Sequence, residues 1–247
     1  MTELYTQSLL HIKNHYSTNL EHWKGLKSWR PVGFAKDHVI GIINLARLTG
    51  ELSILPSVFL VCIFSVGSAV VHGFTREDGT RESLTPEDLA LCFAGRTRLA
   101  AARLAALLRI LHPAVSSACT GDAFRCKETM QRAIQDLEGY AESIVSQSPF
   151  VRYTRYVREG KLDVCAKCKE MIKEREKQEQ QAIWGRLPEL LSIEVPGWPT
   201  VPAPPPPAAI QTAPNPPVAT QTVPNTPAAI QPAPHPSASN ITNGGRL

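Results

Sequence analysis

The stretch SLTPEDLALCFAGRTRLAAARLAALLRILHP, residues 83–113, decides the fold class. It opens with the strongest helix start in the chain. Thr85 can cap the helix through its side-chain oxygen, and Pro86 suits the first helical position. Glu87 and Asp88 follow in the first turn, where carboxylates meet the positive end of the helix dipole.

The rest of this stretch predicts a long helix with an apolar face. We expect it to be interrupted or kinked at Gly95, to reach Leu111 and to be stopped by Pro113. The leucines expected on its core face are Leu99, Leu104, Leu107, Leu108 and Leu111. The arginines fall mostly on its other faces: Arg96, Arg98, Arg103 and Arg109.

Other segments repeat this helical pattern. Asp37 is a good N-cap for a helix through Leu48, which Gly50 would stop. Asp122 caps a further helix whose apolar residues keep helical spacing: Met130, Ile134, Leu137, Ala141 and Ile144. Convincing strand alternation is absent from the sequence. The predicted class is therefore all-α, an irregular multi-helix domain.

Composition divides the chain of 247 residues into three parts. We expect an N-terminal segment at 1–34, a helical domain at 35–198 and a disordered tail at 199–247. Fourteen of the 21 Pro fall in the tail, and nine of these lie in a ten-residue repeat: PAAIQTAPNP (207–216), PVATQTVPNT (217–226) and PAAIQPAPHP (227–236). Such a repeat stays extended and cannot offset the entropy of ordering.

Residues 52–71 carry no charge and form the one transmembrane candidate. Twenty helical residues span about 30 Å, just enough for the core of a bilayer. Its serines, Pro56 and Gly67, and the lack of a basic flank, favour instead a central helix buried on all sides. A small protein anchored to a membrane through 52–71 is the alternative.

Charge and cysteine usage bound the setting. The net charge of +4 permits contact with nucleic acid without arguing for it. The N-terminus lacks the pattern of a secretory signal, so the six Cys indicate a reducing compartment. We therefore expect an intracellular protein of the cytoplasm or nucleus.

Four cysteines form two pairs that could bind a metal. Cys165 and Cys168 make a Cys-x-x-Cys motif, and Cys119 and Cys126 lie upstream in CTGDAFRC. Two thiolate pairs are what a structural zinc site needs, although the spacing of the first pair is longer than usual. Four small buried residues, or a redox pair, are the alternatives.

Geometry predicts that the two pairs meet. Each pair lies at a predicted helix N-terminus, with Asp122 and Asp163 as the N-caps, and the connection over 146–162 is long enough to return the chain. We expect the four sulfurs within roughly 10 Å of one another, the scale of ordinary helix packing.

The second pair opens a long charged stretch. Residues 173–181 contain no apolar side chain, so we expect these turns to project into solvent.

A short basic-aromatic segment, residues 150–161, suggests a further function. Arginines alternate there with Tyr153 and Tyr156, a pattern that suits the stacking of single-stranded nucleic acid. A linker whose aromatic rings pack inward explains the same pattern.

Motifs of known enzymes are missing. The sequence has no nucleophile elbow, no H-E-x-x-H and no glycine-rich phosphate loop, and its histidines are scattered. We predict a protein without enzymatic activity or small-molecule substrate.

Several motifs resemble fungal, chiefly mushroom-type, BTB/POZ domain-containing proteins. They are SILPSVFLVC (53–62), REDGTRESLTPEDLALCFAGRTRL (76–99), the Cys-x-x-Cys helix and the following WGRLP (184–188). HYSTNLEHW (15–23) resembles the segment where the BTB domain of these proteins ends. The resemblance implies the helical region that follows a BTB domain. The BTB domain itself, a mixed α/β dimerisation fold, has no counterpart here, so dimerisation and cullin-type ubiquitin-ligase recruitment are not implied.

We therefore expect a non-enzymatic interaction or adaptor module with protein partners. A nucleic-acid-binding regulatory protein acting through 150–161 is the alternative reading, beside the membrane-anchored protein named above.

Overall fold

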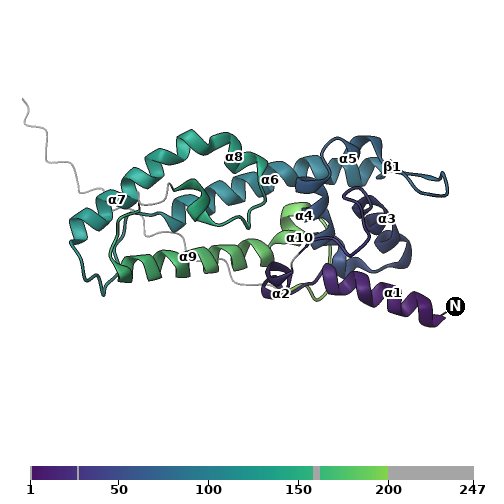
Figure 1. The fold of residues 1–247 in the computed structure, drawn as a ribbon, viewed down its shortest axis with the longest axis horizontal. Helices are drawn as coiled ribbons and strands as arrows, with labels where there is room; N and C mark the ends of the chain where they lie inside the picture. Colours follow the sequence, from purple (N-terminus) through teal and green to yellow (C-terminus); the bar gives the residue numbers. More distant parts are fainter. Residues whose placement is uncertain (1, 27, 158–161, 200–247) are drawn as a thin grey trace, which may run out of the picture. The chain divides into compact units, whose positions relative to one another are not determined.

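The computed structural model of the chain describes residues 2–26, 28–157 and 162–199. Figure 1 shows helices joined by short connections, with one small hairpin. In chain order the elements are α1 (Thr2–His15), α2 (Leu20–Gly25), α3 (Val39–Thr49), η1 (Leu52–Ile54), α4 (Leu55–Ser65), α5 (Ala69–His72), β1 (Phe74–Thr75), β2 (Arg81–Glu82), α6 (Pro86–Ile110), α7 (Ala123–Asp136), η2 (Leu137–Tyr140), α8 (Ala141–Ser146), η3 (Tyr153–Tyr156), α9 (Ala166–Gly185) and α10 (Leu187–Leu191). The predicted all-α class is confirmed. The predicted disordered tail lies outside the described residues from position 200 onward.

Helix α6 is the longest of the described helices, and α4, α8, α9 and α10 all pack against it. Its start is as predicted, because the side chain of Thr85 accepts a hydrogen bond of 3.1 Å from the backbone N–H of Asp88. The expected interruption at Gly95 is wrong. The helix runs through Gly95, where a Cβ would lie 2.7 Å from Leu191 and 3.2 Å from Ile63. Glycine is needed there for close helix packing, not for a kink.

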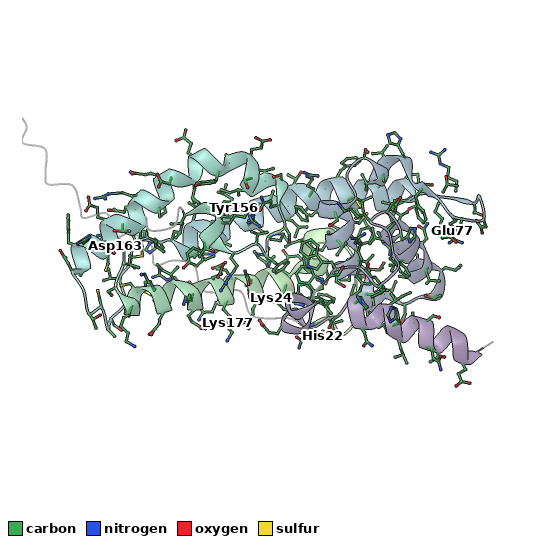
Figure 2. All side chains as sticks on the ribbon, in the orientation of Figure 1. His22, Lys24, Glu77, Tyr156, Asp163 and Lys177 are labelled. Carbon is green, nitrogen blue, oxygen red and sulfur yellow. The ribbon has the colours of Figure 1, made fainter. Side chains whose placement is uncertain are left out.

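The predicted core face of α6 is confirmed at Leu99, Leu107 and Leu111, which are buried, and wrong at its other two leucines. Leu104 and Leu108 are 45% and 43% exposed, whereas Arg103 is only 2% exposed. The guanidinium of Arg103 packs over the ring of Tyr156, 4.9 Å from its centroid, and donates a hydrogen bond to its hydroxyl. Tyr156 is labelled among the helices in Figure 2. Arg103 faces inward because Tyr156, which lies outside the helix, provides an aromatic partner for its guanidinium. The hydrophobicity of position 103 does not explain this orientation.

The uncharged run 52–71 forms three short elements instead of one helix. A turn of 3₁₀ helix leads into α4, whose residues 55–63 are all buried, as a helix surrounded by protein requires. The chain then turns at Gly67, which has a φ of 63°, before α5 begins. The single central helix is therefore wrong, while burial on all sides is confirmed for α4. Within the described residues, no helix has the length and apolar character to cross a membrane.

Helix α3 ends as predicted but does not start as predicted. Gly50 terminates it in the left-handed region, with a φ of 73°. The expected N-cap, Asp37, lies one residue too early: His38 takes the N-cap position and makes no side-chain capping bond. Asp37 contributes through its backbone carbonyl, which accepts a hydrogen bond of 2.9 Å from the N–H of Ile40.

A two-stranded hairpin was not predicted. Phe74 pairs with Glu82 and Thr75 with Arg81, antiparallel across a turn in which Gly79 has a φ of 81°. Strands of two residues are too short to show an alternating pattern, so the sequence carries no signal for them.

Aromatic residues join the first and last described segments in one core. Trp184, near the end of α9, lies 5.3 Å from Trp23 on α2 and 5.5 Å from Trp198, measured between ring centroids. Its indole N–H donates to the carbonyl of Thr18 at 2.7 Å. The indole N–H of Trp198 in turn donates to the carbonyl of Trp184 at 2.9 Å. Residues of the predicted segment 1–34 thus pack into the same interior as the helices that follow.

Candidate metal centre

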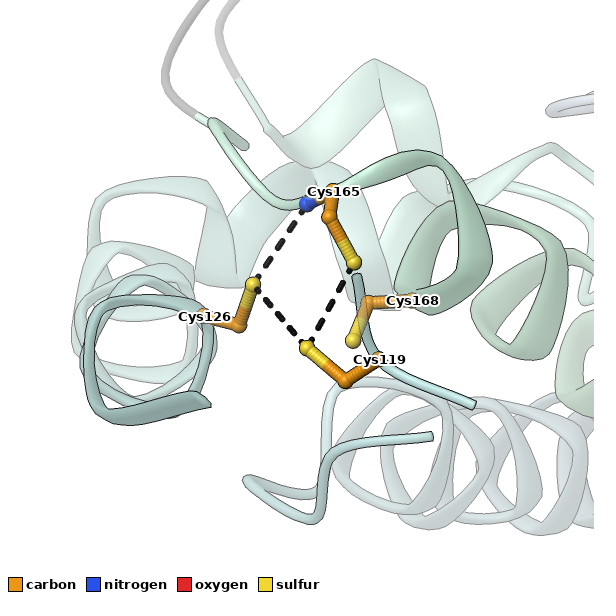
Figure 3. A group of neighbouring side chains, drawn as sticks. All are labelled: Cys119, Cys126, Cys165 and Cys168. Carbon is orange, nitrogen blue, oxygen red and sulfur yellow. Dashed lines mark hydrogen bonds between the residues drawn. The ribbon is translucent and has the colours of Figure 1, made fainter. Parts of the chain in front are cut away.

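Four cysteine sulfurs meet where the loop before α7 faces the start of α9. Their Sγ atoms all lie within 4.8 Å of one another (Figure 3). Cys119 lies 3.5 Å from Cys165 and 4.0 Å from Cys126, between sulfurs. The fourth member, Cys168, is fully buried. The predicted meeting of the two pairs is confirmed.

These separations fit a four-coordinate zinc ion. Sulfurs bound tetrahedrally at about 2.3 Å from zinc lie about 3.8 Å from one another. The observed separations of 3.5–4.0 Å, with an upper limit of 4.8 Å, bracket that value. Filling the site would require sulfur separations to change by at most about 1 Å, because the set already has nearly the required size.

Two local features place the first pair. Asp122 caps α7 as predicted, accepting hydrogen bonds from the backbone N–H groups of Phe124 at 2.9 Å and Arg125 at 3.3 Å. The N-cap position starts the helix so that Cys126 lies in its first turn, buried and facing the other sulfurs. The chain before Asp122 is compact at Gly121, where a Cβ would lie 3.0 Å from the Cβ of Cys165. A side chain at position 121 would therefore push the two pairs apart.

The second pair is placed differently from our expectation. Cys165 itself occupies the N-cap position of α9 and makes no side-chain capping bond, so the prediction of Asp163 as the cap is wrong. Asp163 instead forms an ion pair with Arg125 of α7. Both side chains are well exposed, so this pair contributes little to stability, but it links the same two segments as the cysteines.

Backbone N–H groups surround the sulfurs. The N–H of Cys165 points at the sulfur of Cys126 at a distance of 3.4 Å. The pKa of Cys165 is lowered to about 5, above all by the backbone N–H of Cys168, with the N–H groups of Thr120 and Gly121 and the Cys119 thiol also lowering it against the effect of burial. Donors of this kind stabilise thiolates, the form in which cysteine binds a metal.

The pKa of Cys168, the fully buried cysteine, shifts in the opposite direction when no positive charge lies nearby. Burial first, and then the neighbouring thiols, raise the pKa of Cys168 to about 12. A thiolate at this depth needs a positive partner. The arrangement therefore suits a cation at the centre of the four sulfurs.

The loop that carries Cys119 is held by a residue that we expected in solvent. Arg175 of α9 donates to three backbone carbonyls at and beyond the end of α6: Ile110 at 3.4 Å, His112 at 2.8 Å and Ala114 at 3.1 Å. The carbonyl of Ile110 belongs to the last turn of α6, where a helix leaves its carbonyls without helical partners, and those of His112 and Ala114 lie in the loop that follows. Arg175 thus fixes the path of the chain toward the cysteine cluster.

The prediction that residues 173–181 project into solvent is wrong for one face of α9. Glu176, Glu179 and Gln180 are buried. Glu176 accepts a hydrogen bond of 2.7 Å from the backbone N–H of Tyr153, and Glu179 pairs with Arg109 of α6. One sequence signal could have revealed this buried face of α9. Arg175, Glu176 and Glu179 recur on one side of the helix, where their charges could pair with the arginines of α6.

The basic-aromatic segment turns its described rings inward. Tyr153 is 5% exposed and Tyr156 is fully buried. Stacking of nucleic-acid bases needs accessible ring faces, which these two tyrosines do not offer in this conformation. Residues 158–161 of the segment lie outside the described residues.

In the described part of the chain, these four cysteines are the one group of three or more His, Cys, Asp or Glu side chains that could hold a metal ion. The other two cysteines, Cys62 and Cys92, are buried free thiols away from this group. Comparison with known proteins adds no relative. No family model, no curated protein and no solved structure matches the chain, and the resemblance to fungal BTB proteins stays a prediction.

Proposed function

We propose that this chain is a non-enzymatic protein-interaction module in which one structural zinc ion holds the start of α9 against the loop before α7. The observation that carries the proposal is the closed set of four sulfurs at Cys119, Cys126, Cys165 and Cys168. A catalytic zinc keeps a coordination position for water or substrate, whereas a four-cysteine set occupies all four positions. The chemistry of this site is therefore structural.

A zinc ion would link the start of α7 to the start of α9, two segments that already contact each other. Cys126 and Cys165 belong to segments separated by almost forty residues, and the exposed Arg125–Asp163 pair joins these segments beside the sulfurs. A metal bonded to both segments would make this end of the helical domain rigid.

The exposed face of α6 supports a role in binding proteins. Leu104 and Leu108 lie one turn apart on this face, and each leaves more than two-fifths of its surface open. Pairs of large exposed apolar side chains on a regular helix are suited to cover by a partner. The likeness of the motifs to the helical region of fungal BTB proteins, which are interaction proteins, points the same way.

Metal analysis of the purified protein tests the zinc centre. We expect one zinc per chain, and X-ray absorption should show four sulfur ligands at about 2.3 Å. Cys168→Ser should lose the metal. Cys92→Ala, which removes a buried thiol outside the cluster, is the matched control and should retain it. A metal-free protein in which all six thiols titrate freely would refute the centre.

A separate experiment tests the interaction role. Partners captured by the tagged chain would be purified and titrated against it calorimetrically. We expect saturable binding that Leu104→Gln/Leu108→Gln weakens and that Arg96→Gln, on an adjacent exposed part of α6, leaves unchanged. Failure of every purified candidate to bind, or equal binding by both variants, would contradict this role even if zinc is present.

A further inference from the structure

A second site lies away from the cysteines, between α1, α3 and the β1–β2 hairpin. The structure has a pocket of about 440 Å³ there, open at one side. Its volume lies within the range of small-molecule sites. Ile12 and Ile42 form part of its floor and are both buried, so the apolar end of the pocket belongs to the core.

Aromatic rings form one wall of the pocket. The imidazole of His38 lies between two phenylalanines, 5.7 Å from the ring centroid of Phe34 and 5.1 Å from that of Phe74. All three residues line the pocket and are half-buried. Phe34 and His38 come from the segment that leads into α3 and Phe74 from the first strand of the hairpin, so two separate segments contribute to one wall.

Acidic groups gather at the other end. Glu82 lines the pocket and is only 8% exposed, and its carboxylate accepts a hydrogen bond of 2.9 Å from the side chain of Asn44. Glu77, labelled at the hairpin in Figure 2, and Asp78 lie at the rim and are exposed. Arg76 also lines the pocket and forms an ion pair with Glu82. Arg76 compensates the charge of Glu82, so the excess negative charge of the pocket lining belongs to Glu77 and Asp78 at the exposed rim.

We infer that this pocket binds a small apolar organic cation, an ammonium group carrying an alkyl or aryl chain of about six carbons. The apolar chain would lie against Ile12 and Ile42, and the ammonium would lie beside Glu82 and the aromatic wall. Positive charge is favoured both by carboxylates and by aromatic rings, and an apolar tail can contact the buried isoleucines of the pocket floor.

The charge of the pocket discriminates against other ligand classes. A carboxylate or phosphate ligand of the same size would meet the carboxylates of Glu77 and Asp78 at the rim, beyond the Arg76–Glu82 ion pair. A neutral chain would gain the apolar contacts only. The site is built from α1, α3 and the hairpin, none of which carries a cysteine of the cluster, so this inference stands independently of the zinc centre.

Three probes of equal chain length test the inference on the full-length protein: n-hexylammonium, 1-hexanol and hexanoate. Binding is followed by two-dimensional ¹H–¹⁵N NMR, which reports both affinity and place. We expect n-hexylammonium to bind about tenfold more tightly than 1-hexanol, with hexanoate weakest, since one Coulombic contact and one cation–π contact separate the probes. The shifts should centre on Gly41, Ile42 and Phe74.

Variants then assign the charge preference to the pocket. Glu82→Gln should bring the affinities for n-hexylammonium and 1-hexanol to within about twofold, and Glu77→Gln, at an exposed hairpin position that cannot unfold the core, should reduce the preference partway. Glu138→Gln, an exposed acid on η2, is the control and should leave the preference intact. Three outcomes on the wild-type protein alone would overturn the inference. They are equal affinity for the three probes, NMR shifts spread over the acidic surface, and no saturation by any probe.

Discussion

Arg109 on α6 donates two hydrogen bonds to the carboxylate of Glu179 on α9, from Nε to Oε1 at 2.6 Å and from Nη2 to Oε2 at 2.7 Å. Glu179 is buried, and its hydrogen bond raises the pKa of Arg109. This bidentate pair joins the two long helices through the very stretch of α9 that lacks apolar side chains. Polar contacts therefore replace apolar ones along this part of the helix interface.

Glu179→Ala should lower the free energy of unfolding by about 2–3 kcal/mol, because it leaves Arg109 without its partner in a partly buried place. Urea denaturation measures the effect. Combination with Arg109→Ala should reveal a coupling of about 1 kcal/mol or more. Glu174→Ala, at an exposed position of the same helix, should change stability by less than about 0.5 kcal/mol. A coupling near zero would show that the pair does not contribute.

Gly95→Ala should destabilise the protein by about 1–3 kcal/mol despite the better helix propensity of alanine. The new methyl group would lie 2.7 Å from Leu191, inside the contact between α6 and α10. Gly139→Ala is the matched control, since nothing lies within 4 Å of a Cβ at that position. We expect the control to be neutral or slightly stabilising in a thermal melt. Equal melting temperatures for the two variants would argue against close packing at Gly95.

Tyr156→Phe should cost about 1–3 kcal/mol, because the hydroxyl of Tyr156 accepts a hydrogen bond from the buried guanidinium of Arg103. Nε and Nη1 of Arg103 have no hydrogen-bond partner in the described part of the chain, so the loss of the hydroxyl leaves the cation poorly satisfied. Tyr140→Phe removes a hydroxyl outside this contact from a ring packed edge-on against Tyr156. Tyr140→Phe should unfold at nearly the same urea concentration as the wild type. A similar loss of stability in Tyr156→Phe and Tyr140→Phe would contradict the role of the hydrogen bond from Arg103.

Trp198→Ala should destabilise the protein by about 3–5 kcal/mol, the usual cost of removing a buried tryptophan. Trp198 is 6% exposed, packs on Trp184 and donates to its carbonyl. Trp29→Ala, at a tryptophan that is 42% exposed, provides the comparison and should cost about 1 kcal/mol. Differential scanning calorimetry measures both variants. A wild-type melting temperature for Trp198→Ala would place the folded boundary before residue 198.

Removal of zinc by a chelator should lower the melting temperature, and added zinc should restore it in a concentration-dependent way. Gly121→Ala should weaken zinc binding about tenfold, because a Cβ at this position lies 3.0 Å from that of Cys165. Gly25→Ala, where a Cβ meets nothing within 4 Å, is the control. Competition with a chromophoric zinc chelator gives the affinities. Unchanged affinity in Gly121→Ala would mean that the cluster tolerates separation of its two segments.

Some features of the fold could be predicted because their causes lie within a few residues. The capping bonds of Thr85 and Asp122 join a side chain to the backbone two or three residues later, and Gly50 and Gly79 adopt positive φ values within their own turns. Ser, Thr and Asp have such preferences through their side-chain oxygens, and Gly through its lack of a Cβ, wherever they occur. The metal ligands were proposed on similar grounds, since cysteine type and pairing are visible in the sequence.

Other features depended on contacts between distant segments. Asp37 and Asp163 have the side chain of an N-cap, but helix packing sets the first turn one or two residues further on, so neither caps its helix. Gly67 lies within an uncharged run that periodicity alone joins into one helix, and the break there follows from the packing of α4 and α5 as separate elements.

The sequence by itself determined the helical class, the local starts and stops of several helices and the identity of the four cysteines. Tertiary structure decided which charged side chains are inside. Arg103 is buried because Tyr156 reaches it from 53 positions away, and Glu179 because Arg109 lies across the helix interface. Burial of a charge is favourable only when a partner compensates its lost hydration, and that partner is defined by the fold and not by the neighbouring residues.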